Sequence, residues 1–343
     1  MVGWQWRGGW KRFGWMMIAA LGLVPAAGGT EWAQEPECWI PRRVLDPLDQ
    51  CPTWTGRTDA LLLWRSAPQG VGLFDSLGPG AGLNAADLTS GMAAGPRFTL
   101  FRHTGDLGAI EFNYFRVQDF TASRTLPTTD GGYVFADGVL CCNVETPLND
   151  AGAALASEFQ SFELNRRFPT DGRVQWLAGF RWVQWNESLG INAVTDLPGQ
   201  TVDIDTATNN DLYGMQVGLD SILWRNGSRF WIEGLGKAGL FYNRAAQFTS
   251  FDLSIPEERI AGGTSTSRAA FVGELGVTGV WQVNDWLALR TGWVAFWLSG
   301  IAQGPNQLAE QCLICEDRPI RQATDTGGSV FVNGLTLGLE ARW

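Results

Sequence analysis

The final residues of the chain alternate strictly between apolar and polar positions. One face of the extended chain carries Leu335, Leu337, Leu339, Ala341 and Trp343, and the residues between them share the other face. A period of two predicts a β-strand, and charges on the second face indicate a strand between an apolar medium and water. An apolar outward face with aromatic residues at its ends is typical of transmembrane β-barrels, so we expect this strand to close a barrel.

The same alternation, combined with turn chemistry, predicts about ten strands, with twelve as the alternative. The strands are expected near residues 58–66, 95–102, 108–120, 158–167, 173–185, 211–223, 229–243, 270–283, 287–298 and 330–343. Asn226 and Gly227 form one of the turns, because their sequence favours the positive φ angles of a tight hairpin.

Short and long connections alternate between these strands. The short connections are at residues 103–107, 168–172, 224–228 and 284–286, and the long ones are at 67–94, 121–157, 186–210, 244–269 and 299–329. A secreted β-sandwich would not sort its loops in this way. The pattern predicts an all-β fold, a closed antiparallel transmembrane β-barrel with short periplasmic turns and long extracellular loops.

Charged residues on the expected strands share the face opposite the apolar one. A solvated sheet face is the alternative explanation. Because Arg or Lys facing lipid at mid-membrane costs about 2–4 kcal/mol, we expect these side chains to point into the lumen and to pair there. The candidates are Arg97, Glu111, Glu163, Arg173, Arg181, Glu233, Lys237, Glu274, Arg290, Glu340 and Arg342.

The beginning of the chain resembles an export signal. Arg7, Lys11 and Arg12 precede an apolar run from Phe13 to Val24, and small residues follow Pro25. The run is shorter than the ~20 apolar residues of a membrane-spanning helix. We therefore expect a signal peptide at residues 1–29, an N-terminal periplasmic segment at 30–57 and an outer-membrane barrel at 58–343.

Composition narrows the class of protein further. The net charge is −10, and removal of the three basic residues of the signal peptide would leave −13. Such acidity disfavours nucleic acid as a partner, because phosphates require basic patches. Beyond the signal peptide no apolar stretch approaches the ~18 residues of a helical span, so a membrane-embedded chain would have to be a closed barrel.

Six cysteines in an exported chain predict disulfide bonds. The candidates are Cys38, Cys51, Cys141, Cys142, Cys312 and Cys315. The Cys-x-x-Cys spacing at the last pair also allows zinc, and free thiols are the third possibility. Adjacent cysteines fit a closed zinc site poorly, so we expect disulfides and no metal, with the pairing left open.

Catalytic motifs are weak in this chain. Residues 234–239 match Gly-x-Gly-x-x-Gly, but they lie within a strand pattern and open no helix. The single histidine, His103, falls in an expected periplasmic turn, so we expect no enzyme, no catalytic residue and no cofactor. Asp196, Asp203 and Asp205 fall in an expected loop and could bind a hard cation or form solvated surface charge. An acidic mouth would favour cations in either case.

Five motifs, in this order along the chain, resemble the seventh beta-barrel porin family of planctomycetes. They are Asn84-Ala-Ala-Asp-Leu88, Gly179-Phe-Arg-Trp182, Asn210-Asp-Leu-Tyr-Gly214, Lys237-Ala-Gly-Leu-Phe-Tyr-Asn243 and Phe271-Val-Gly-Glu-Leu-Gly276. Leu298-Ser-Gly-Ile-Ala302 followed by Pro305-Asn-Gln-Leu-Ala309 is similar to the late segment of that family. The resemblance runs from about Asp59 to Trp343 and implies an outer-membrane barrel, without supplying catalytic residues.

The function expected from these features is that of a small or narrow porin for passive solute passage. The alternative is a structural or surface-interaction barrel with a plugged lumen, because eight strands just fill their interior and ten lie close to that limit. The expected partners are outer-membrane lipid and the barrel-assembly machinery, which would contact the C-terminal strand. The oligomeric state is left open.

Overall fold

The structure is a computed structural model, and it describes residues 53–78, 80–126, 132–136, 139, 147–168, 174–227, 229–308 and 323–343. The expected signal peptide, Arg173 and all six candidate disulfide cysteines lie outside the described residues, so those predictions stay open.

The described chain is built almost wholly of strands. In chain order, its elements are β1 (Trp54–Arg65), β2 (Gly72–Ser76), β3 (Leu83–Asn84), the 3₁₀ turn η1 (Ala85–Asp87), β4 (Ala93–His103), the 3₁₀ turn η2 (Gly105–Leu107), β5 (Ala109–Leu126), β6 (Tyr133–Phe135), β7 (Leu148–Arg167), β8 (Val174–Thr195), β9 (Thr201–Asn226), β10 (Phe230–Leu253), β11 (Glu258–Gln282), β12 (Leu287–Ile301), α1 (Gly304–Leu308) and β13 (Gly328–Arg342).

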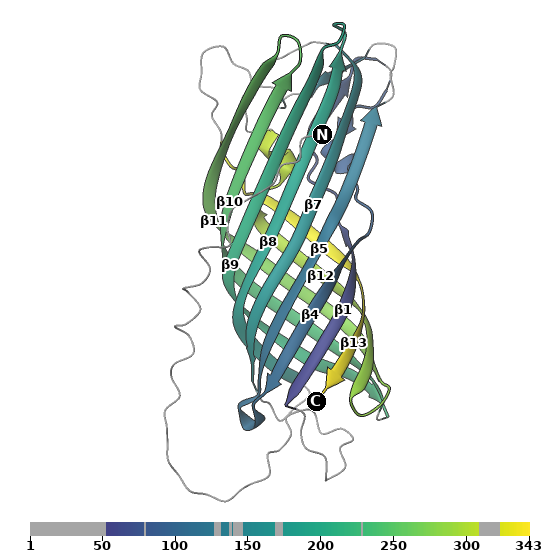
Figure 1. Cartoon of the computed structure of the whole chain (residues 1–343), viewed down its shortest axis with the longest axis vertical. Helices are drawn as coiled ribbons and strands as arrows, with labels where there is room; N and C mark the ends of the chain where they lie inside the picture. The colour runs from purple at the N-terminus through teal and green to yellow at the C-terminus, as the bar shows by residue number, and fades with distance from the viewer. Residues whose placement is uncertain are drawn as a thin grey trace, which may run out of the picture. The chain divides into compact units, whose positions relative to one another are not determined.

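Ten of these strands pair in a closed antiparallel ring. The order around the ring is β1, β4, β5, β7, β8, β9, β10, β11, β12 and β13, and pairing of β13 with β1 completes it. The prediction of a closed barrel of about ten strands is therefore confirmed (Figure 1). Strand β1 begins at Trp54, so residues 54–57 belong to the barrel and not to the expected N-terminal segment.

The outward face of the barrel is apolar over a continuous band. Leu240, Met215 and Leu275 are exposed by 75%, 65% and 61%, although each is a large hydrophobic side chain. The side chains of Leu335, Leu337 and Leu339 on β13, and of Trp343 directly after it, are likewise exposed. A closed ring leaves no unpaired backbone inside the band, and this combination is what a transmembrane β-barrel requires.

The two ends of the barrel differ. The short-turn end, as we call it, carries the connections at residues 104–108, 168–173, 227–229 and 283–286, as the sequence predicted. Gly227 has a φ of +65° in its hairpin, which explains the need for glycine at that turn. We call the opposite end the far end; the connections there are of very different lengths.

At the far end, the prediction of long loops is wrong at two of the five places. Residues 186–210 and 244–269 lie mostly in strands, and the connections are only residues 196–200 and 254–257. Strands β5 and β7 to β11 therefore rise beyond the rest of the barrel as a wall (Figure 1). Asp203 and Asp205 point outward from this wall, so they do not form an acidic mouth above the lumen.

Candidate functional site

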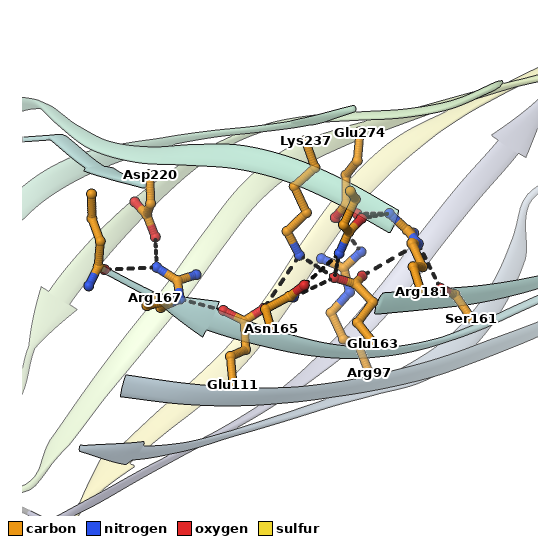
Figure 2. A network of polar contacts seen from close by, with 12 residues as sticks. Arg97, Glu111, Ser161, Glu163, Asn165, Arg167, Arg181, Asp220, Lys237 and Glu274 are labelled. Atoms are coloured by element: carbon orange, nitrogen blue, oxygen red, sulfur yellow. Dashed lines mark hydrogen bonds and ion pairs between the residues drawn. The ribbon is translucent and has the colours of Figure 1, made fainter. Parts of the chain in front are cut away.

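The interior of the barrel at the short-turn end is filled by charged side chains. Lys237 of β10 lies between two carboxylates, with its Nζ 2.7 Å from Glu163 Oε2 and 3.4 Å from Glu111 Oε1. Arg167 also pairs with Glu111 and reaches Asp220 Oδ2 at 2.9 Å. The chain of contacts crosses from β5 and β7 to β9 and β10 (Figure 2).

A second group of ion pairs centres on Glu274 of β11. Its two carboxylate oxygens lie 3.1 Å from Arg97 Nη2 and 2.9 Å from Arg181 Nη1. Arg181 also lies 3.6 Å from Glu163 and donates from Nε to Ser161 Oγ at 2.9 Å. Strands on opposite sides of the ring are thus joined through the lumen (Figure 2).

A third group surrounds Glu340 of β13. Three guanidinium groups reach its carboxylate, from Arg342 at 2.6 Å, Arg57 at 2.7 Å and Arg290 at 2.8 Å. Arg290 also pairs with Glu233 of β10 at 2.9 Å. Glu340 is almost wholly buried, and removing ions from water is costly unless they are paired in this way.

Together these residues form what we call the charge layer. Its seven basic members (Arg57, Arg97, Arg167, Arg181, Lys237, Arg290 and Arg342) match seven acidic ones (Asp59, Glu111, Glu163, Asp220, Glu233, Glu274 and Glu340). Within the described part of the chain the two sets balance, so these charges compensate one another without a counter-ion. The space between them is a cavity of about 70 Å³, enough for a few water molecules.

Ten of the eleven lumen-facing charges named from the sequence lie in this layer, and the eleventh, Arg173, is outside the described residues. Sequence reasoning missed Arg57, Arg167 and Asp220, which take part in the ion pairs, and Asp59, which lines the cavity between them. Arg167 lies four residues from Glu163 along β7 and therefore on the same face of the strand, so the alternation alone could have identified it.

Above the charge layer the lumen is filled by an aromatic layer, formed by Phe115, Phe120, Phe159, Trp185 and Phe296. All five side chains are buried. The ring centroids of Phe159 lie 4.9 Å from those of Phe115 and 5.2 Å from those of Phe296, in edge-to-face geometry. The Arg97 guanidinium covers the Phe115 ring at 5.2 Å and joins the two layers.

A short segment between β12 and β13 then turns into the lumen from the far end. This inner segment, Ala302 to Leu308, includes α1 and is buried throughout. The Asn210 side chain accepts from the Ala302 amide at 2.7 Å and donates to its carbonyl at 2.8 Å. Glu187 Oε2 accepts from the Gly304 amide at 2.9 Å.

Glu187 connects the inner segment to the wall of the barrel. The Arg65 guanidinium lies 2.8 Å from its Oε1, and the Trp185 indole donates to that same oxygen at 3.0 Å. Beyond the inner segment, an apolar cluster that includes Leu73, Phe74 and Leu308 fills the far end. Charge layer, aromatic layer, inner segment and apolar cluster therefore follow one another along the lumen.

His103 lies at the short-turn end of β4, apart from the far end. Its Nε2 is 2.9 Å from Thr55 Oγ1, and its ring stacks near Phe101. The hydrogen bond joins the end of β4 to the start of β1, which is a structural contact. Neither of these contacts involves a carboxylate.

Among the described residues, no helix is both long and apolar enough to cross a bilayer. No protein-family model matches the chain. No curated protein matches it either. The resemblance to the planctomycete porin family is therefore a prediction still.

Solved structures that the chain resembles are barrels at low similarity. The outer membrane protease OmpT from Escherichia coli has 9% identity and a TM-score of 0.47, with 84% of this chain and 96% of that chain covered. The toluene transporter TodX from P. putida has 10% identity and a TM-score of 0.20, covering 85% and 90%. A FadL homologue from Pseudomonas aeruginosa has 10% identity and a TM-score of 0.23, covering 85% and 90%. At these scores the similarities carry no argument about function.

Proposed function

We propose that this protein is an outer-membrane β-barrel with a closed lumen, which acts as a structural or surface-interaction protein. The observation that carries the proposal is the continuous filling of the interior. A solute would have to displace the paired ions around Lys237 and Glu163, then the Phe159 and Phe296 rings, and then the inner segment. Ten strands lie near the size at which side chains fill a barrel, so such filling is physically expected.

The location follows from the outward face. A band of exposed apolar side chains around a closed sheet is stable in lipid and unfavourable in water. We infer that the chain is exported and inserted into an outer membrane, where its lipid partners contact this band. Recovery of the protein in the membrane fraction, with migration on gels that changes on heating, is the expected result. Release as a soluble protein by osmotic shock would contradict it.

A narrow porin is the second candidate. The cavity of about 70 Å³ in the charge layer favours it, because a polar space at the short-turn end would serve as the entrance of a narrow pore. Passage would then require the aromatic layer and the inner segment to move together. We infer no enzymatic role, since His103, the single histidine of the chain, is bound to Thr55 at the short-turn end.

Single-channel recording in planar bilayers tests the proposal. We expect no conductance steps from protein whose folding is verified by heat-dependent gel migration. A sixteen-stranded porin reconstituted in the same way is the positive control, because such barrels leave a water channel. Steady conductance comparable to that control would overturn the closed-lumen function, and small, reproducible steps would favour the narrow porin.

A further inference from the structure

The wall at the far end has an open edge along β11. Strand β12 pairs with β11 only from Phe271 onward, whereas β10 pairs with it along its whole length. From Glu258 to Ala270, the part of the chain that the structure describes therefore places a strand on one side of β11 alone. Along the middle of this edge, the odd-numbered side chains are exposed and the even-numbered ones are half-buried, with the Thr264 hydroxyl 2.6 Å from that of Thr324. An edge of this kind is a template for a further strand.

The direction of the free backbone groups follows from the pairing at the other end of β11. The Gln282 amide donates to Arg229 on the β10 side, and the Val283 amide donates to Leu287 on the β12 side. The β10–β11 register has no bulge between Gln282 and the open edge. Even-numbered residues of β11 therefore keep directing their backbone groups to β10, and odd-numbered residues direct theirs to the other side. Residues with odd numbers, Ala261, Gly263 and Ser265 among them, therefore direct their N–H and C=O groups to the open side.

The opposite edge of the wall is protected, whereas this one is not. Strand β5 pairs with β4 only as far as Phe115, and beyond that point it carries a bulge at Asp119, whose φ is +65°. Charges at Arg116 and Arg124 add to the protection. Bulges and charges are the devices that prevent edge pairing. Between Ile260 and Ser267, β11 has no charge, no bulge and no proline.

We propose that the open edge of β11 pairs with β11 of a second copy of this chain, antiparallel and centred on Gly263. In this register Gly263 lies opposite its own copy and Ala261 lies opposite the partner's Ser265. All these residues direct their backbone groups to the open side, so they form the hydrogen-bonded pairs of an antiparallel ladder. Pairing on a two-fold axis makes the same edge complementary to itself.

Charge complementarity selects this register. It places Glu258 opposite the partner's Arg268, and by symmetry Arg268 opposite the partner's Glu258. Both side chains are exposed, and neither forms an ion pair with another described residue. Opposite charges directly across an antiparallel pair are favourable, whereas like charges are unfavourable. Shifting the register by one pairing step separates the two charges.

The symmetry has a consequence for the membrane. The two-fold axis of an antiparallel pair is perpendicular to the strands, so the two barrels point in opposite directions. Copies in one membrane have the same direction and cannot form this pair; copies in two facing membranes can. The inference rests on the proposed surface-interaction function and gives it a partner, a second copy that links two membrane surfaces by strand pairing.

The test uses full-length protein in detergent and in vesicles of phosphatidylcholine. We expect wild type to be dimeric by light scattering coupled to size exclusion and to cluster vesicles, measured by turbidity. Ser265→Pro removes an amide directed to the open side and leaves the β10 ladder intact, so dimers and clustering should be lost while heat-dependent gel migration is unchanged. A monomeric wild type over the whole concentration range would overturn the proposal.

Charge exchange supplies the second arm. Arg268→Glu should raise the dimer Kd roughly tenfold, because it creates two like-charge pairs. Adding Glu258→Arg should restore the wild-type Kd. Arg259→Ala is the matched control, because that side chain pairs with Asp252 of its own chain and should leave the Kd within about twofold.

A Kd that is unaffected by Arg268→Glu, or dimers that persist in Ser265→Pro, would refute this register and this edge. The conductance experiment is independent of these outcomes. If the protein is monomeric and does not conduct, the strand-pairing proposal is refuted and the closed-lumen proposal is kept. If the protein conducts, the closed-lumen proposal is refuted, whatever the oligomeric state.

Discussion

Lys237 gives a quantitative test of the charge layer, because its ammonium group is almost wholly buried between Glu163 and Glu111. Removing one member of a buried ion pair costs about 3–5 kcal/mol when the partner is left uncompensated. Here each carboxylate keeps an arginine, Arg181 for Glu163 and Arg167 for Glu111. We therefore expect Lys237→Met to lower the free energy of unfolding by about 2–3 kcal/mol, below the range for an isolated partner.

The matched change on the other side is Glu163→Gln, which keeps the shape of the side chain and removes its charge. Lys237 then retains Glu111, and Arg181 retains Glu274, so the expected cost is about 2 kcal/mol. The double variant removes both charges at once. It should be more stable than the sum of the single effects predicts, by about 1–2 kcal/mol.

Unfolding by guanidinium in lipid vesicles, followed by tryptophan fluorescence, measures these differences. Arg116→Ala is the control, because Arg116 pairs with Glu158 on the outward face at an exposed position, and its loss should cost less than about 1 kcal/mol. If the two single effects add to within about 0.5 kcal/mol in the double variant, Lys237 and Glu163 are not coupled and the charge layer does not act as a network.

Three further outcomes follow from the interior and the wall. Phe296→Ala should lower the free energy of unfolding by about 3–5 kcal/mol in the same assay, because it opens a cavity between rings that are fully buried; a cost below 1 kcal/mol would contradict the aromatic layer. Asn210→Ala should speed amide exchange of the inner segment measured by mass spectrometry, since the Ala302 amide loses its acceptor; unchanged exchange would show that other contacts hold the segment. Burial raises the pKa of Asp203 above its ordinary value, and the carboxylates of Asp205 and Asp252 raise it further, so the far end of the β9–β10 ladder, where Asp203 lies opposite Asp252, should lose stability as the pH rises through that raised value. Asp203→Asn should slow amide exchange at this end of the ladder at pH 7 and weaken its dependence on pH, and a variant identical to wild type at every pH would refute the assignment.

Strand phase was predictable because lipid and lumen differ so strongly as surroundings. Along β8 the side chains of Trp176, Phe180 and Trp182 face outward, and Arg181 faces the charge layer, as the alternation indicates. A shift of one residue would have placed Arg181 in lipid. The large penalty for that error fixes the phase from sequence alone.

The partners inside the lumen were not predictable in the same way. Which carboxylate pairs with Arg181 depends on the stagger of the strands around the ring. The sequence of β8 does not determine that stagger, so it could not predict the contact with Glu274 of β11. The inner segment was missed for a related reason. The inner segment is a stretch without periodicity, and it is held by hydrogen bonds between Ala302 and Asn210 and between Gly304 and Glu187, which are more than ninety residues away in the chain.

The length of the wall could have been inferred from a change that the sequence does contain. On β8 the apolar residues, apart from Leu177, have even numbers as far as Trp182 and odd numbers from Val183 to Ile191, although the strand has no bulge there. The side chains keep their directions, so the change must lie in the surroundings: lipid lies outside the first part, and water lies outside the second. Strand β9 shows the same inversion, with Val217 outward in the first region and Ile204 inward in the second. An apolar pattern that changes phase along a straight strand therefore marks the membrane surface, and it separates a long strand that leaves the bilayer from a strand that ends in a loop.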